Sequence, residues 1–494
     1  MSPHFLTCKN ERFLALAGMM FSKPKVFGLL LVFLFFCGRA DALVYPPLVD
    51  NDEWAGMYFK GKKLGFSHSV LHVGAEFVTV TTQNYMKLKN EGVDQVTSFT
   101  QETVLTPDLR LVSFSLLQEV SGHRQRVDGR MKNGELLCQI TNKGYGKEKR
   151  IPFPSDMAVS STYMLNIYKR GLQAGAKGTV PIFIEVLQSP SLVEYEVLRQ
   201  ERMDGADIFV IRQKLGGMES TLWVAEDGSV IKELSAQGFE SRRESKAVAQ
   251  ALAEETLTMS SFITLSLVKP QREIISPYTK RRLVLKLSHL RMPDLMPIDR
   301  RQRVLKTERE SDQSYVSTLE VSSELPIQRA VSFPVKLFPE LLEDTPEIQS
   351  AHPEIRTLAR QLVGNKKDAW EAALSINHWV YKNMEKAMID TVTALDALHD
   401  RRGECQSHTN LFVALARAAG IPARVISGLV YSNEYNGFLY HAWPEVYVGE
   451  WRALDPTFGQ DLVDATHIKL GEWEQAGPLK LLDFIGKVGI ELID

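Results

Sequence analysis

The chain has 494 residues, of which 44% are hydrophobic and 24% are charged, so its composition is that of a globular protein. The formal net charge of −2 at pH 7 excludes the strongly basic class of nucleic-acid-binding proteins. A chain of this length is expected to form more than one domain.

Residues 1–42 have the pattern of a secretory signal peptide. Lys23 and Lys25 precede an apolar run at residues 26–36, and the small residues Ala40 and Ala42 follow it. This run is shorter than the roughly 20 residues that a helix needs to span a bilayer. We therefore predict cleavage after Ala42 and an exported bacterial protein, periplasmic or extracellular. A membrane anchor formed by an uncleaved signal is the less favoured alternative.

Export would change both the charge and the set of cysteines. Removing residues 1–42 takes away five basic and two acidic side chains, which moves the net charge from −2 to −5. Cys8 and Cys37 leave with the signal peptide, so Cys138 and Cys405 are the cysteines of the mature chain. Two cysteines do not make a disulfide scaffold, and we predict that both are free thiols.

Residues 43–258 are predicted to be a β-rich N-terminal region of one or two subdomains. Short β-branched and aromatic runs alternate there with turn residues, and Asn133-Gly134 and Asp227-Gly228 are typical of hairpin turns. Residues 155–170 are more helical in composition and separate two β stretches. The sequence leaves open whether these stretches form one large curved sheet or two related halves.

Residues 259–335 are predicted to be a small β-rich domain or a linker, with strands at 282–287 and 315–321. Between Lys269 and Glu310 there are twelve basic and five acidic side chains. Such an excess is more typical of a solvated face or linker than of a site for an anionic cell-envelope polymer, which remains an alternative partner.

Residues 336–494 change from strand to helix periodicity and back. Apolar residues recur three and four positions apart at 339–363 and 368–384, and strand-like runs return after Ala423. Because helices and strands are segregated along the chain, we predict an α+β domain here. The whole fold is therefore expected to be multidomain, with mostly antiparallel β structure followed by an α+β core.

Cys405 is predicted to lie in the first turn of a helix. An Ala- and Leu-rich run follows it, and Gly420 is a typical helix stop. The N-terminus of a helix has free amide donors and a partial positive charge, which favour a thiolate and would also stabilise an oxyanion. Taken alone, a cysteine in this position is more often structural than catalytic.

Three further motifs follow Cys405 in a specific order. Gly420 to Arg424 reads Gly-Ile-Pro-Ala-Arg, His441 is followed by Ala-Trp, and Asp455 is followed by Pro-Thr. This set resembles the transglutaminase-like superfamily. The resemblance covers about residues 390–460 well and extends to the helices from roughly 340, but it leaves the first 300 residues unexplained.

The resemblance implies a papain-like core with a catalytic triad. In it, Cys405 attacks an amide carbonyl, His441 acts as base and then acid, and Asp455 orients the imidazole. The acyl-thioester then passes to an amine in a transglutaminase, or to water in a peptidase or amidase, cell-wall peptides included. A third function keeps the triad as a vestige in a non-catalytic envelope binding or assembly protein.

Each member of the triad has an alternative interpretation. His441 could be a hydrogen-bonded strand histidine, Asp455 could simply start an Asp-Pro turn, and His408 is a rival base three residues after Cys405. Histidine and cysteine spacing does not indicate a metal site, so no metal or cofactor is predicted. The candidates for a second oxyanion donor are Trp379, Asn383 and His399.

Strand register sets a condition on the triad. A two-residue turn at Gly449-Glu450 would place His441 opposite Phe458, with its side chain facing away from Asp455. One bulged residue in the first strand would instead place His441 opposite Thr457, with Asp455 on the same face. Because Pro444 cannot donate to a ladder, we predict this bulge between Ala442 and Val446.

Overall fold

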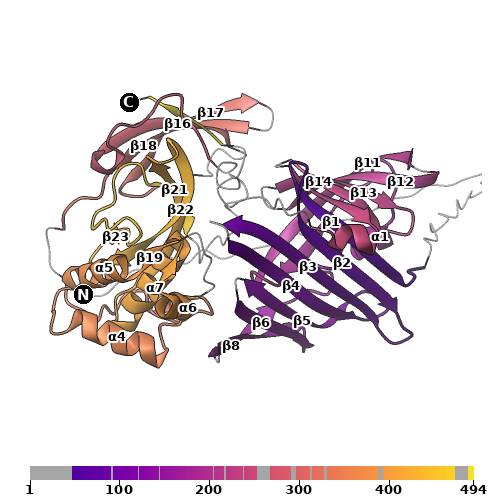
Figure 1. The fold of residues 1–494 in the computed structure, drawn as a ribbon, viewed down its shortest axis with the longest axis horizontal. Helices are drawn as coiled ribbons and strands as arrows, with labels where there is room; N and C mark the ends of the chain where they lie inside the picture. The colour runs from indigo at the N-terminus through magenta and orange to yellow at the C-terminus, as the bar shows by residue number, and fades with distance from the viewer. Residues whose placement is uncertain are drawn as a thin grey trace, which may run out of the picture. The chain divides into compact units, whose positions relative to one another are not determined.

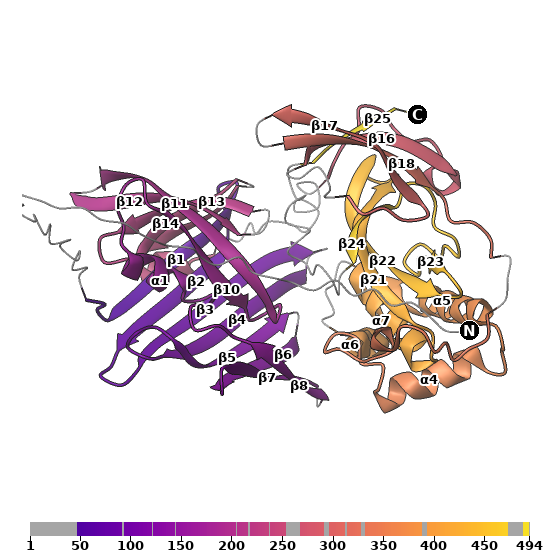
Figure 2. The same cartoon turned by 180° about the vertical axis from the view of Figure 1, so that it is seen from behind.

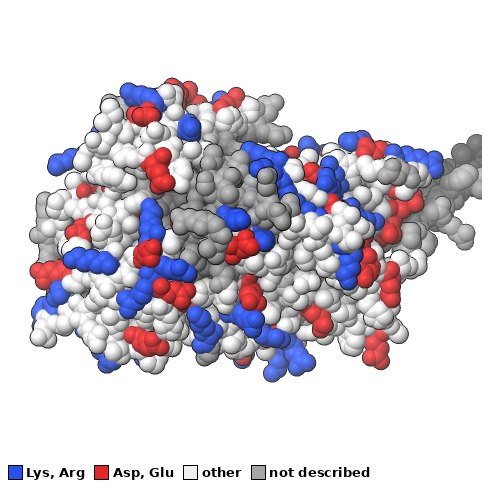
Figure 3. Space-filling model, in the orientation of Figure 1, with Lys and Arg blue, Asp and Glu red and all other residues white. Residues whose placement is uncertain are grey.

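The computed structural model describes residues 47–493, except for residues 91–92, 121, 144, 204, 216–217, 237, 253–266, 291–295, 312–313, 328–330, 388–392 and 473–487. The predicted signal peptide lies outside the described residues, so its cleavage stays a prediction. Within the described part, no helix combines the length and the apolar character needed to cross a bilayer. On the face shown in Figure 3, basic and acidic side chains are interspersed, as the small net charge of the sequence leads one to expect.

A large, almost entirely antiparallel sheet occupies most of the N-terminal region (indigo to magenta in Figure 1). Its strands in the described chain are β1 Asn51–Phe59, β2 Lys62–Val73, β3 Val78–Asn90, β4 Val93–Leu105, β5 Leu111–Val120, β6 His123–Lys132, β7 Glu135–Asn142, β8 Tyr145–Pro152, β9 Ala158–Val159, β10 Lys177–Ile184, β11 Ser189–Met203, β12 Ala206–Leu215, β13 Met218–Ala225, β14 Val230–Ser235 and β15 Phe239–Glu244. Two short helices accompany it, α1 Tyr163–Arg170 and α2 Lys246–Gln250.

The two β stretches on either side of α1 form one curled sheet. Strand β1 pairs with β15, which joins the meander β1–β8 to the meander β10–β15. The ring centroids of Phe114 on β5 and Phe183 on β10 are 6.2 Å apart, although these strands are far apart in the sheet order. The sheet therefore closes over a shared hydrophobic core, and the single-sheet arrangement is the one that forms (Figure 2).

Both predicted hairpin turns are confirmed. Asn133 and Gly134 have φ angles of 53° and 81° and link β6 to β7 as a two-residue turn, with Lys132 opposite Glu135. Such a turn requires positive φ at both central residues, which Asn and Gly tolerate best. Gly228 also has a positive φ, of 84°, in the longer turn between β13 and β14.

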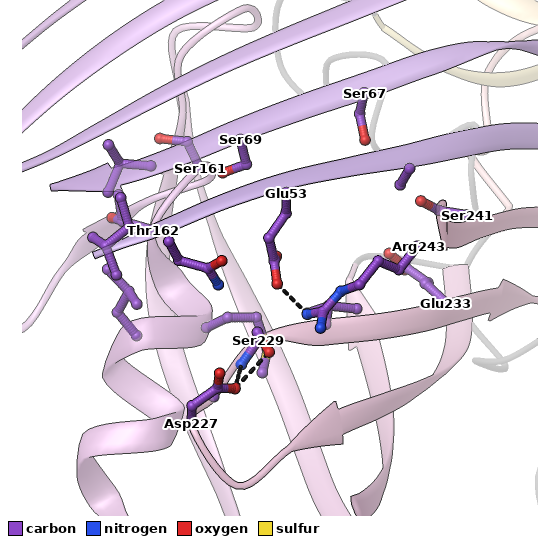
Figure 4. A pocket seen from close by; sticks show the side chains of 18 of the residues that line it. Glu53, Ser67, Ser69, Ser161, Thr162, Asp227, Ser229, Glu233, Ser241 and Arg243 are labelled. Carbon is purple, nitrogen blue, oxygen red and sulfur yellow. Dashed lines mark hydrogen bonds and ion pairs between the residues drawn. The ribbon is translucent and has the colours of Figure 1, made fainter. Parts of the chain in front are cut away.

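The inner face of this sheet lines a cavity of about 280 Å³ (Figure 4). Serine and threonine hydroxyls line much of it, and an ion pair joins Glu53 to Arg243. Glu233 accepts hydrogen bonds from Gln213 Nε2 and Ser220 Oγ. Glu53 and Glu233 thus have partners within the sheet, and apolar side chains such as Leu71, Val80 and Leu222 line the rest of the cavity.

A second sheet contains β16 Arg282–Leu290, β17 Gln302–Ser311, β18 Ser314–Ser322 and β25 Gly489–Leu492, in the order β17-β18-β16-β25. The strands predicted at 282–287 and 315–321 are confirmed, whereas β17 was not predicted because its sequence is charged and its side chains are mostly exposed. The C-terminal strand β25 pairs with β16, so the chain end returns to this sheet. The predicted domain boundaries stay a prediction.

The C-terminal part has the predicted α+β character. Its helices are η1 Pro277–Thr279, η2 Pro339–Leu341, α4 Pro353–Val363, α5 Ala369–Asn383, α6 Ala394–Asp400 and α7 Cys405–Ala418. Its strands are β19 Glu385–Lys386, β20 Arg402–Gly403, β21 Ala423–Ser432, β22 Gly437–Tyr447, β23 Trp451–Ala453 and β24 Ile468–Glu472. The prediction of helix over 339–363 was wrong before Pro353, since only a single 3-10 turn lies between residues 339 and 352.

Helix α7 forms the centre of this part. Every residue from Ser407 to Arg417 is buried, and the helix packs against α4, α5, α6, β21 and β22. The helix ends at Ala418, and Gly420 turns the chain away from it with a φ of 85°; a Cβ added at Gly420 would lie 2.6 Å from Pro334. Four strands in the order β23-β22-β21-β24 complete the fold.

Gly428 on β21 provides a test of this packing. A Cβ at this position would lie 2.2 Å from the carbonyl oxygen of Ile468 and 2.3 Å from the Trp443 indole. We expect Gly428→Ala to lower the free energy of unfolding by about 1–3 kcal/mol, as overpacking of a core does. Chemical denaturation followed by tryptophan fluorescence measures this change.

Gly146→Ala is the matched control, because the nearest atom to its added Cβ is the flexible amide end of Gln139, 3.1 Å away. We expect Gly146→Ala to change the stability far less than Gly428→Ala. Equal effects of the two substitutions would contradict the described contact between Gly428 and Trp443.

Candidate active site

Cys405 is the first residue of α7, as predicted. Its side chain is partly exposed, and the residues that follow it in the helix are almost all buried. The residue before it, Glu404, has an extended backbone and makes no side-chain cap of the helix. The amide donors of the first turn are therefore not occupied by a capping side chain, and they lie next to the thiol.

A hydrogen bond fixes the start of α7 against strand β22. The Thr409 hydroxyl donates to the carbonyl oxygen of Ala442 over 3.0 Å, and both groups are buried. Thr409 lies one helical turn after Cys405, and Ala442 directly follows His441. This contact aligns the helix that carries the thiol with the strand that carries the imidazole.

His441 and Asp455 form a buried hydrogen-bonded pair. The Nε2 atom of His441 lies 2.7 Å from Oδ2 of Asp455, and their side chains are 5% and 0% exposed. Because Nε2 is occupied by the carboxylate, Nδ1 is the ring nitrogen left to face Cys405. Cys405 itself contributes a hydrogen bond and a charge to the protonation equilibrium of His441.

His441 and Asp455 lie on the same face of the sheet, as the predicted register requires, but the bulge that we predicted is not the reason. Strand β22 pairs with β21 without a break from Gly437 to Val446, so the bulge predicted between Ala442 and Val446 is absent and that prediction was wrong. The shift of one residue lies in the turn, where Tyr447 pairs with Trp451 across three residues, including Gly449 with a φ of 94°.

This three-residue turn has the same consequence for the triad as the predicted bulge. The amide of Val448 donates to the carbonyl oxygen of Glu450, which closes the turn, and Leu454 continues the ladder by donating to Pro444. Extended past Leu454, this register places Asp455 opposite Trp443, two residues along from His441 on the same face of β22, before the chain turns at residues 456–459. The turn residues, and not Pro444, therefore decide whether the pair can form.

The Asp455 carboxylate accepts four hydrogen bonds. Its Oδ1 atom accepts from the backbone amides of Thr457 and Phe458, at 2.7 and 3.2 Å. Its Oδ2 atom accepts from His441 and also from Nε2 of His467, which is 3.1 Å away and fully buried. Sequence reasoning missed His467, since it lies twelve residues after Asp455 and belongs to no motif of the resemblance.

The charges in this cluster stabilise an ionised His441. Burial alone would lower the pKa of His441, but the charges of Asp455 and Cys405 outweigh burial and raise its pKa to about 9. Burial likewise opposes ionisation of Asp455, yet His441 and His467 hold its pKa well below its usual range. The site therefore favours a carboxylate and an imidazolium at neutral pH.

His441, Asp455 and His467 also have the composition of a metal site, with their ligand atoms within 4.8 Å of one another. Both Nε2 atoms, however, lie at hydrogen-bond distance from one carboxylate oxygen. Each of these nitrogens would have to give up its bond to Asp455 to bind an ion. The contacts are those of two imidazole donors that share an acceptor.

Aromatic rings hold the His441 imidazole in place. Phe458 stacks on it with 5.0 Å between ring centroids, and the fully buried Trp443 lies 6.1 Å away on a nearly parallel plane. On its other side Phe458 lines a hollow of about 750 Å³ together with Tyr278, Tyr381 and Lys386. The Lys386 ammonium lies 4.5 Å above the Phe458 ring.

The other candidates from the sequence have different partners. His408 is buried, its Nδ1 donates to the carbonyl oxygen of Glu404 over 2.9 Å, and burial lowers its pKa. His399 Nε2 pairs with the Glu354 carboxylate, and the side-chain amide of Asn383 donates to the backbone carbonyl oxygen of Trp379. The Trp379 ring lies 4.4 Å from the Arg401 guanidinium. None of these contacts involves Cys405, His441 or Asp455.

Comparisons with known proteins find similarity over part of this chain. Residues 356–456 match the transglutaminase-like superfamily. An uncharacterized protein of Mycobacterium leprae is 32% identical over 98 residues, which cover 18% of this chain and 34% of that protein. The kyphoscoliosis peptidase of Mus musculus is 32% identical over 83 residues, 15% of this chain and 12% of the peptidase. The chain thus spans about a third or less of the length of these relatives.

Among solved structures, a candidate cysteine protease from Cytophaga hutchinsonii is similar over 42% of this chain and 85% of that chain, with 19% identity and a TM-score of 0.31. A score this low supports no conclusion about function. The family match and the described α+β fold place the C-terminal part of the chain in the transglutaminase-like superfamily. This part is accordingly a papain-like domain of the class that contains cysteine enzymes.

The two thiols of the described chain differ in a way that a simple reagent detects. Both are free, as predicted. Cys138 on β7 is fully buried, and burial raises its pKa to about 12, whereas Cys405 is partly exposed at a helix N-terminus.

We expect a thiol reagent such as iodoacetamide to alkylate Cys405 in the folded protein and Cys138 only after unfolding. Peptide mass mapping of native and denatured samples measures this difference. Rapid labelling of Cys138 in the native protein, or protection of Cys405, would contradict the described environments.

Proposed function

We propose that this protein is an exported thiol enzyme that acts on amide bonds of proteins or peptides through Cys405, His441 and Asp455. The observation that carries the proposal is the position of His441 between the two other residues. Its Nε2 atom lies 2.7 Å from Oδ2 of Asp455, and Cys405, a partly exposed thiol at a helix N-terminus, contributes a hydrogen bond and a charge to its protonation equilibrium. Nucleophile, base and orienting carboxylate thus stand in the order that thiol catalysis requires.

The first half of the reaction forms a thioester. The Cys405 thiolate attacks the carbonyl carbon of the substrate amide, and the electron pair of the carbonyl bond moves to the oxygen. Amides at the start of α7 stabilise this oxyanion. The His441 imidazolium then gives its proton to the substrate nitrogen, the C–N bond breaks, and ammonia or an amine leaves.

The second half releases the acyl group. An acceptor amine or water gives a proton to the now neutral His441 and attacks the thioester carbon, after which the thiolate leaves. Asp455 remains ionised throughout and stabilises the imidazolium in each half. We favour an amine as the acceptor, as in acyl transfer by a transglutaminase.

Hydrolysis is the second candidate. The kyphoscoliosis peptidase, which is 32% identical to this chain over 83 residues, is named as a peptidase. The same residues would serve a peptidase or amidase on peptides, cell-wall peptides included, with water as the acceptor. Export rests on the pattern of residues 1–42, and an exported protein would meet such substrates in the envelope.

A labelled primary amine and a glutamine-containing protein distinguish transfer from hydrolysis. We expect amine incorporation by the wild-type protein and a loss of roughly 10⁴-fold or more in Cys405→Ala, because the nucleophile is removed. New peptide termini without amine incorporation would support hydrolysis.

Cys138→Ala is the matched control, since it removes the buried thiol and leaves the proposed site intact. We expect it to keep the wild-type rate. If neither reaction occurs and Cys405→Ala also retains the cellular role, the proposal fails and a non-catalytic envelope binding or assembly role is favoured.

The raised pKa of His441 predicts the alkaline limit of the reaction, which is the pH above which kcat/KM falls. Its pKa of about 9 is above the ordinary value of 6.5, so the imidazolium persists through neutral pH and is lost as the pH rises through about 9. The leaving nitrogen then lacks its proton donor, and kcat/KM should fall. A pH profile of kcat/KM measures this limb, and an alkaline limb near pH 6.5 would contradict the described charge cluster.

A further inference from the structure

His467 extends the charge cluster beyond the proposed triad. It directly precedes β24, is 0% exposed, and points its Nε2 atom at Asp455 Oδ2 over 3.1 Å. The same oxygen accepts from His441 at 2.7 Å. A carboxylate oxygen has two lone-pair directions, so two imidazoles together satisfy it fully.

A second carboxylate lies on the other side of His467. The Nδ1 atom is 3.5 Å from Oδ1 of Asp464, which is an ion-pair distance without hydrogen-bond geometry. Asp464 is fixed in place, because its carboxylate accepts from the amide and hydroxyl of Thr466 and from Gln460 Nε2. His467 thus lies between two buried carboxylates. Burial lowers the pKa of His467, but its contacts with Asp455 and Asp464 outweigh burial and raise the pKa above its ordinary value, which favours the charged imidazolium.

Surrounding groups determine the orientation of the His467 ring. Trp443 meets it edge-on at 5.2 Å between centroids, with an interplanar angle of 88°. The buried guanidinium of Arg301 donates to the carbonyl oxygens of Asp464 and His467, at 2.9 and 3.3 Å. Arg301 precedes β17, so a residue from the segment before the helices supports this turn.

We propose that His467 is a positioning residue that holds Asp455 in its catalytic orientation and sets the proton affinity of His441 through its positive charge. The proposal rests on the proposed function of the triad. Asp455 is otherwise held by two backbone amides on its Oδ1 atom alone. Without the second imidazole, Oδ2 would have one donor and could rotate with the His441 ring.

The hydrogen bond from His467 to Asp455 and the positive charge of His467 should affect the reaction in different ways. Loss of the hydrogen bond should loosen Asp455 and lower kcat, with little effect on KM, because His467 does not reach the substrate. Loss of the charge should strengthen the attraction of Asp455 for a protonated His441. The ring centroids of the two histidines are 5.8 Å apart. At an effective dielectric constant of about 20, removal of the His467 charge should raise the pH at which His441 loses its proton by about 1 to 2 pH units.

Two substitutions test these consequences. His467→Gln keeps a nitrogen donor near the position of Nε2 but removes the charge, and His467→Leu removes both. The measurement is the rate of Cys405 alkylation by iodoacetate as a function of pH. The rate requires the thiolate, and it falls when His441 loses its proton, because the imidazolium attracts this anionic reagent. Steady-state kinetics with the amine-transfer assay follows for each folded variant.

We expect the alkaline limit to rise in both variants. We expect His467→Gln to retain most of the wild-type kcat, and His467→Leu to lose up to roughly 100-fold in kcat at an unchanged KM. A purely structural role would lower the thermal stability and the amount of reactive Cys405, but leave the alkaline limit and the rate per reactive thiol unchanged. That result would overturn the proposal.

The outcomes also separate this inference from the proposed function. If wild-type Cys405 has no thiolate at neutral pH, the proposed function itself fails. If the wild-type protein has the thiolate and neither variant moves its alkaline limit, only the role of His467 fails. Should His467→Leu not fold, His467→Gln still decides, since the shift of the alkaline limit depends on the charge alone.

Discussion

The chemistry of the site depends on the buried carboxylate of Asp455. A carboxylate without exposure to water is unstable unless every lone pair has a donor, and here four donors are supplied. Two are backbone amides of the turn that follows Asp455, and two are imidazoles from separate segments. Removing any one of them would leave an unsatisfied charge in the core, which explains why so much local structure converges on one residue.

The surrounding fold supplies those donors from several directions. Strand β22 carries His441, the residues just before β24 supply His467, and Arg301 fixes the turn between Asp464 and His467. Thr409 links the helix of Cys405 to the same strand. Contacts to β22 or its neighbours thus hold both the Cys405 thiol and the Asp455 carboxylate, so the positions of these two groups depend on the same strand. The residues before the helices take part in this packing, because the core of β16 and β18 includes Tyr431 and Phe438 of the C-terminal sheet.

Sequence reasoning proposed the triad because its motifs are local. Cys405 at a helix start, the His-Ala-Trp strand and the Asp-Pro-Thr turn are each visible within a few residues, and turn signals and β-branched runs predicted the β-rich N-terminal region and the strands at 282–287 and 315–321. The position of the register shift was missed, since Pro444 suggested a bulge whereas the shift lies in the three-residue turn around Gly449. The sequence from Tyr447 to Trp451 does not by itself indicate whether the turn has two or three residues, because the length depends on which residues of the two strands pair.

His467 could not be predicted for a different reason. A lone histidine before a strand has no signature, and only the tertiary approach of Asp455 and Asp464 gives it a role. The pairing of β1 with β15, which joins the two meanders of the N-terminal sheet, could not be predicted either, because a pairing across nearly two hundred residues leaves no local pattern. The charged sequence of β17 gave no strand signal, although the pairing of β17 with β18 holds it in a sheet whatever its surface composition. Local motifs thus predicted which residues form the candidate site, and long-range contacts determined their environment.

The most direct test of the account is to trap the acyl-enzyme. A glutamine-containing peptide is mixed with the protein, quenched in acid within the first turnover, and the intact mass of the protein is measured. We predict an adduct equal to the peptide minus ammonia, located on Cys405, released by hydroxylamine and lost in His441→Ala. An adduct on another residue, or amine incorporation with no trapped thioester under any quench time, would contradict the account.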